Sequence, residues 1–103
     1  MDTAAYTMTV TVNGNEKSTF PVTGVKSTDY ISITVTLKNG YRNSYTNMQL
    51  SINHIGCDEY TPSPSSSSSY KKTWVFRPTM LAGDESARSG TLMYATLCGI
   101  TYD

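Results

Sequence analysis

The stretch YTMTVTV, residues 6–12, decides the fold class of this chain. Every second residue is large and apolar, and threonine fills the positions between them. An extended chain points successive side chains to opposite faces, so this pattern predicts a half-buried β-strand. The next residues, NGN at 13–15, contain an Asn-Gly pair, which favours the positive φ angles of a tight hairpin turn.

The same alternation recurs along the rest of the chain. Further strands are expected at 18–22, 30–37, 47–55, 70–76 and 91–102. Pro21 places the first of these at a sheet edge, because proline cannot donate to a ladder. Apolar residues on both faces of 91–102 predict a central strand. The chain is therefore predicted to be all-β, as a single antiparallel β-sandwich or a small barrel with about six to seven strands.

The inward-facing positions of these strands define the expected core. Trp74 is placed in it because Phe76 shares its face and because large aromatic side chains are mostly buried. The residues expected to be buried are Val10, Ile33, Val35, Leu50, Ile52, Trp74, Phe76 and Leu92.

The order of Cys57, Trp74 and Cys98 is that of the core of immunoglobulin domains. An immunoglobulin-like architecture is compatible with this order, but the spacing does not indicate membership: four strands are expected before Cys57, where that family has one, and none follows Cys98. Two interpretations of the cysteines remain open. In an oxidising compartment Cys57 and Cys98 form a disulfide that closes a loop of about 40 residues, and in a reducing one they are small apolar side chains.

Residues 60–70, YTPSPSSSSSY, cannot contribute to a core, because prolines and consecutive serines offer little apolar surface. The segment after this tract is too short to be stable alone, and its apolar stretches need a partner surface. We therefore predict one β domain over 1–103, with a Ser/Pro-rich loop at 60–70 in which residues 61–69 are exposed and mobile.

Charge is sparse and balanced. Eight basic and eight acidic residues give a formal net charge of +0, and charged residues make up 16% of the chain, against about 25% in typical soluble domains. Nucleic-acid binding relies on clustered Lys and Arg, and a transmembrane helix needs a long apolar run, so neither nucleic acid binding nor membrane insertion is expected. A surface rich in Thr, Ser and Tyr favours a place on a virion or an extracellular surface.

The densest group of reactive side chains is HIGCDE, residues 54–59. His54 and Cys57 offer two ligands where zinc takes four, so neither a metal nor another cofactor is expected, and His54 is interpreted as a hydrogen-bonded histidine at a strand end. A Cys–His nucleophile pair lacks an orienting third group, and no glycine-rich phosphate loop is present. We predict no catalytic residue.

Two candidate contact surfaces follow from the aromatic residues and from the first strand. Tyrosines near turns and near the serine tract anchor proteins or stack on sugars; they are Tyr41, Tyr45, Tyr60 and Tyr70. The first strand lacks protective charge or proline, so an edge position would expose Thr7, Thr9 and Thr11 to another strand.

These features predict a non-catalytic structural or binding module of a virus particle or cell-surface appendage. It would act through protein–protein contacts, with a partner protein or with other copies of itself. The alternatives are a carbohydrate-binding module and a small phage-encoded inhibitor of a host protein.

Overall fold

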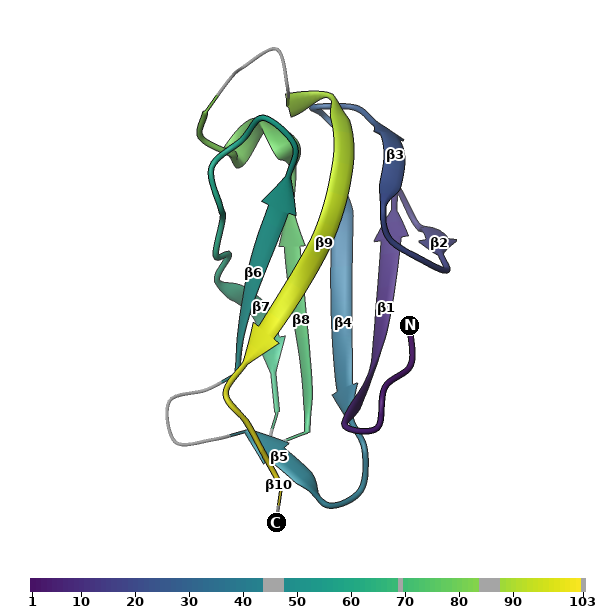
Figure 1. Ribbon diagram of the computed structural model, residues 1–103, viewed down its shortest axis with the longest axis vertical. Coiled ribbons are helices and arrows are strands. Elements are labelled where there is room, and N and C mark those ends of the chain that lie inside the picture. The colour runs from purple at the N-terminus through teal and green to yellow at the C-terminus, as the bar shows by residue number, and fades with distance from the viewer. Residues whose placement is uncertain (44–47, 69, 84–87, 103) are drawn as a thin grey trace.

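The computed structural model describes residues 1–43, 48–68, 70–83 and 88–102. Within these residues the chain is nearly all β, with two antiparallel sheets packed as a sandwich (Figure 1), which confirms the predicted fold class. The elements are β1 (Tyr6–Val12), β2 (Asn15–Lys17), β3 (Val22–Val25), β4 (Ile31–Leu37), β5 (Tyr41–Asn43), β6 (Gln49–His54), β7 (Pro64–Ser67), β8 (Lys71–Phe76), the 3-10 turn η1 (Pro78–Met80), β9 (Gly90–Cys98) and β10 (Ile100–Tyr102).

The larger sheet has the strand order β2-β1-β4-β8-β7. Its centre is β4, which pairs with β1 from Tyr6↔Leu37 to Val12↔Ile31 and with β8 on its other side. The edges of this sheet are two short strands, β2 and β7.

The smaller sheet has the order β3-β9-β6, so the strand expected to be central, β9, is central. The predicted strand at 91–102 is divided at Gly99, which has a φ of 85° that favours glycine. Beyond Gly99, β10 leaves this sheet and pairs with β5 at one end of the molecule.

The core between the sheets contains every residue that the alternation placed there. Trp74 and Phe76 are each 1% exposed, and Ile33 is fully buried. The buried apolar cluster unites strands before and after the serine tract; it consists of Met8, Val10, Val12, Val22, Val25, Ile31, Ile33, Val35, Leu37, Met48, Leu50, Ile52, Trp74, Phe76 and Leu92.

The predicted Asn-Gly hairpin turn is confirmed. Asn13 and Gly14 have φ angles of 52° and 83° and connect β1 to β2, as a type I′ turn requires. The Asn13 side chain also accepts a hydrogen bond from the Tyr30 amide at 2.8 Å and donates one to Asp29 at 3.0 Å. These bonds attach the turn to the segment that precedes β4.

The strand predicted at 18–22 is wrong. Strand β2 begins directly after the hairpin turn and pairs with β1. The next strand, β3, begins only at Val22. A cis peptide bond between Phe20 and Pro21 lies in the connection. The edge position expected for this strand therefore has no counterpart; the strands on either side of the connection, β2 and β3, are each at the edge of a sheet.

The serine tract is not entirely a loop. Pro64, Ser66 and Ser67 pair with β8 and extend the larger sheet by one strand, while their side chains stay exposed. Pro62 is buried, against the expectation that nothing in this segment packs. Serine side chains do not oppose this pairing, because the ladder uses backbone groups.

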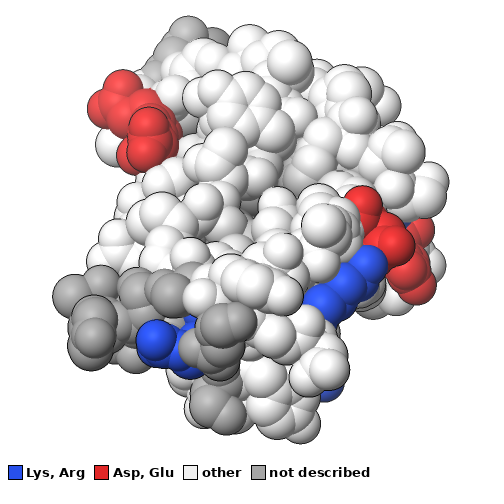
Figure 2. Space-filling model, turned by 60° about the horizontal axis from the view of Figure 1, so that its bottom comes forward, with Lys and Arg blue, Asp and Glu red and all other residues white. Residues whose placement is uncertain are grey.

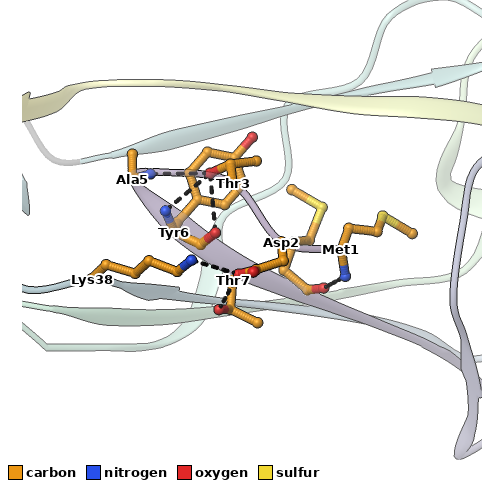
Figure 3. A network of polar contacts seen from close by, with 8 residues as sticks. Met1, Asp2, Thr3, Ala5, Tyr6, Thr7 and Lys38 are labelled. Carbon is orange, nitrogen blue, oxygen red and sulfur yellow. Dashed lines mark hydrogen bonds and ion pairs between the residues drawn. The ribbon is translucent and has the colours of Figure 1, made fainter.

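The first strand, β1, is not at an edge, so the condition under which Thr7, Thr9 and Thr11 would form a contact surface is not met. One half of the outer side of β1 pairs with β2, and the N-terminal residues cover the other half (Figure 3). Met1 and Met8 exchange hydrogen bonds of 2.7 and 2.8 Å, and Asp2 bonds both Lys38 at 2.7 Å and the Thr7 hydroxyl at 3.2 Å. The backbone at Thr7, Thr9 and Thr11 is directed to β4, so it offers no free ladder to a partner.

Candidate binding surface at the open side of the sandwich

One edge of each sheet lies on the same side of the molecule. This side is bounded by β6, the edge of the smaller sheet, and by β7, the edge of the larger one (Figure 1). We call these two strands with the connecting segment 61–64 the open side. It contains a groove of about 240 Å³, which is lined by Met48, Gln49, Thr61, Pro62, Ser63, Pro64, Lys72 and Trp74.

The edge of β6 is covered only in part. Ile52 and Tyr60 exchange backbone hydrogen bonds of 2.7 and 3.1 Å as an isolated bridge. Two residues further, Pro62 has no N–H to donate, so the ladder does not continue. Among the described residues no strand pairs with the edge of β6 at Leu50, although Thr61 lies beside the strand with its hydroxyl 3.5 Å from that of Ser51.

The groove contains a buried cation. Lys72 alternates with Trp74 and Phe76, so its side chain points between the sheets, and it is only 3% exposed. Its Nζ donates to the Met48 carbonyl oxygen at 2.8 Å and lies 6.0 Å from the centroid of the Trp74 ring. Burial lowers the pKa of Lys72 below its usual value of 10.5.

No carboxylate balances this cation within the described part of the chain. The salt bridge found there joins Lys38 to Asp2, at the N-terminal end of β1. An ammonium has three N–H donors, and the Met48 carbonyl accepts one of them. A buried charge normally has a charged partner, and among the described residues Lys72 has none.

The edge at β7 is uncharged and accessible. Its sequence is PSSS, and all four residues are exposed. The opposite edge of the same sheet, β2, has the sequence NEK, and Glu16 and Lys17 are the kind of charges that protect an edge from pairing.

The tyrosines selected from the sequence do not form one surface. Tyr60 is half-buried with its ring 5.9 Å from that of Phe76, at the end of β8, and exposed Tyr70 precedes the start of β8. They are separated by about 20 Å along the strand. Tyr41 contacts Tyr102 across the β5–β10 pair, with ring centroids 4.9 Å apart and ring planes tilted by 60°, and so does not belong to the open side. Tyr45 lies outside the described residues.

The two cysteines do not form a disulfide. Cys98 lies opposite Gln49 at one end of β6, and Cys57 follows His54 at the other end. The strand between them spans about 17 Å, far more than the roughly 7 Å that a disulfide can bridge.

The residues 54–59 form no metal centre. The described residues contain no group of three or more His, Cys, Asp and Glu side chains able to hold a metal ion. His54 is 1% exposed, and its Nδ1 lies 3.1 Å from the Ile55 carbonyl oxygen. Its buried Nε2 has no hydrogen-bond partner among the residues that the structure describes, so the expectation of a satisfied histidine holds there for one ring nitrogen and not for the other.

A second, smaller depression lies on the outer face of the smaller sheet. It measures about 170 Å³ and is lined by Ser51, Ile52, Asn53, Glu59, Tyr94 and Thr96. Tyr94 is 47% exposed and stands on β9, where a register shift against β6 turns it outward although it lies two residues after buried Leu92.

Lys72 and Tyr94 were not selected from the sequence, because candidate binding residues were chosen by type, as tyrosines near turns. The signal for Lys72 was in the alternation, because Lys72 falls on the same face as Trp74 and Phe76. A cation on an apolar face departs from the pattern of its strand. Strict alternation places Tyr94 on the face of buried Leu92, and the register shift between them that turns Tyr94 outward is not visible in the sequence.

Comparison with protein-family models, with curated proteins and with solved structures found no match. In the part of the chain that the structure describes, no helix has the length and apolar character needed to cross a membrane.

Proposed function

We propose that this chain is a non-catalytic structural or binding module that acts through protein–protein contacts at its open side, as a component of a virus particle or cell-surface appendage. The observation that carries the proposal is the pair of uncharged strand edges, β6 and β7, on one side of the sandwich. Free, uncharged edges are templates for a strand from another chain. In β7 the register shift at Pro64 leaves Ser66 and Ser67 as its regular part.

The surface supports contact between copies of the chain. The formal net charge is +0, so copies do not repel one another through a large net charge. The face seen in Figure 2 is largely uncharged, with charged side chains in a few separate places. Pairing between β7 strands of two copies would continue the larger sheet across the contact.

The test is a lysine at Ser66 in β7, with Asn15→Lys in β2 as the matched control. Ser66 lies opposite Thr73, on the outer face of the sheet, so the new charge is kept away from Lys72. Both variants add one lysine to an exposed edge residue. Sedimentation velocity over a range of concentrations should show association of the parent and of Asn15→Lys, and weaker association of Ser66→Lys. A parent that stays monomeric contradicts contact between copies, and an equal response of the two variants contradicts the use of β7.

Carbohydrate binding is the second candidate function, and the depression beside Tyr94 favours it. An exposed aromatic ring stacks on the apolar face of a sugar, while the Glu59 carboxylate and the Asn53 amide, with nearby hydroxyls, can bind sugar hydroxyls. The test measures retention of the chain on immobilised glycans. Tyr94→Ser should abolish retention, and Tyr70→Ser, a change of another exposed tyrosine outside the depression, should not. Loss of retention in both variants, or in neither, contradicts this site.

A further inference from the structure

We propose that the groove of the open side binds a carboxylate group, presented by an acidic side chain in an extended segment of a partner protein, with Lys72 as the cation that recognises it. This inference rests on the proposed function and adds the chemistry of the partner. Three features carry it: the buried ammonium, the composition of the groove walls, and the open edge of β6.

The buried ammonium needs an acceptor that the described residues do not supply. Lys72 is 3% exposed and has one hydrogen-bond partner there, the carbonyl oxygen of Met48. Leaving a charge buried without a counter-charge is costly, whereas a hydrogen-bonded ion pair compensates for much of that cost. A ligand that brings a negatively charged oxygen into the groove would therefore be stabilised by its interaction with the Lys72 ammonium, which has no counter-charge among the described residues.

The groove is matched to a carboxylate on a short aliphatic stem. A single lysine supplies one positive charge, which a carboxylate neutralises, whereas a phosphate brings more negative charge and three strong acceptor oxygens. Pro62, Pro64 and Trp74 form apolar walls for the methylene groups of an acidic side chain. Thr61, Ser63 and Gln49 provide further hydrogen-bond donors at the groove.

The open edge of β6 indicates why the carboxylate belongs to an extended segment. Backbone pairing to this edge stops after the Ile52–Tyr60 bridge, and the groove begins beside the uncovered part of the strand. An added strand gains affinity from main-chain hydrogen bonds and specificity from side-chain pockets next to the edge. One side chain of such a strand would enter the groove.

The experiment uses two peptides, Thr-Val-Glu-Val-Thr and Thr-Val-Gln-Val-Thr, each acetylated and amidated so that the glutamate carries the only carboxylate. The chain is labelled with ¹³C at the lysine ε-carbon, and the Lys72 signal is followed by NMR during titration. Lys72→Met removes the ammonium, and Lys71→Met is the control, since Lys71 is its exposed neighbour. Sodium acetate is titrated separately as a free carboxylate.

The glutamate peptide should shift the Lys72 signal saturably and bind about tenfold or more tightly than the glutamine peptide, as expected for a charged hydrogen bond. Lys72→Met should remove this preference, and Lys71→Met should keep it. Equal binding of the two peptides overturns the carboxylate site but leaves contact at the open side, which the Ser66→Lys experiment tests independently. Binding of neither peptide, or a response of Lys72 to acetate alone, overturns recognition of a partner's acidic side chain.

Discussion

Replacing Ile33 with alanine tests the register on which the whole sandwich depends. Ile33 is fully buried in the central strand β4, where it lies opposite Val10 and Trp74. The substitution removes three carbon atoms, each worth about 0.8 kcal/mol when buried, or about 2.4 kcal/mol together. A residual cavity on the order of 50 Å³ would add about 1 kcal/mol. We expect a loss of about 3–4 kcal/mol of unfolding free energy.

Trp74 makes this loss directly measurable. It is the only tryptophan of the chain, it is 1% exposed, and it is the cross-strand neighbour of Ile33. Urea unfolding followed by tryptophan fluorescence gives the free energy of each variant. At about 4–8 °C per kcal/mol for a domain of this size, the midpoint of thermal unfolding should fall by more than about 10 °C.

Ser32→Ala is the matched control, because Ser32 directly precedes Ile33 in β4 and points to the opposite face of the sheet. It should cost about 0.5 kcal/mol or less, as is usual for changes outside the core. A loss below about 1 kcal/mol for Ile33→Ala, or equal losses for the two variants, would refute the register, because a shift of one residue exchanges the two faces of the strand.

Three further predictions concern titration and thiols. The pKa of Asp29 is lowered by hydrogen bonds from the Lys26 amide and from Asn13; its contribution to stability is therefore present above pH 3.8 and lost as the pH falls through the lowered pKa. The stability difference between the parent and Asp29→Asn, measured by urea unfolding, should shrink in acid. The pKa of Lys72 is lowered by burial, so the folded state releases its proton before the unfolded state does. The unfolding free energy of the parent should therefore rise relative to that of Lys72→Met as the pH rises from the lowered pKa towards 10.5. A difference in unfolding free energy between the two proteins that does not change with pH would contradict the burial of a charged amine. Because Cys57 and Cys98 lie at opposite ends of β6, the melting temperature should be the same with and without a reducing agent.

The alternation of apolar and polar residues predicted most of the strands and all the named core residues. Alternation in 6–12 and 30–37 reports which face each residue occupies, and burying that face is the main favourable term in folding. The Asn13-Gly14 turn was equally predictable, because positive φ angles at consecutive positions are a local property of these residue types. The errors came where local preference and pairing disagree. Serines 66 and 67 have no strand signal of their own, and β8 supplies the ladder that makes them a strand.

The candidate site depended on strand order, which alternation does not report. The first strand, β1, carries no charge that would keep another strand from pairing with it, yet β2 and the N-terminal residues already pair with its outer side. The edges that border the open side are β6 and β7, from separate sheets, while β2 and β3 are the other edges of the same two sheets. Strands β6 and β7 adjoin only because the sheets pack face to face.

By itself the sequence determined the fold class, the inward faces of β1, β4, β6 and β8, and the low charge of the surface, since these follow from residue type and period. The tertiary structure alone decided which edges stay open, that Cys57 and Cys98 are far apart, and that Lys72 lies in a groove beside Met48. These are relations between segments distant in the chain. They are set by how two sheets bury their apolar faces together, and no local pattern of residues records that packing.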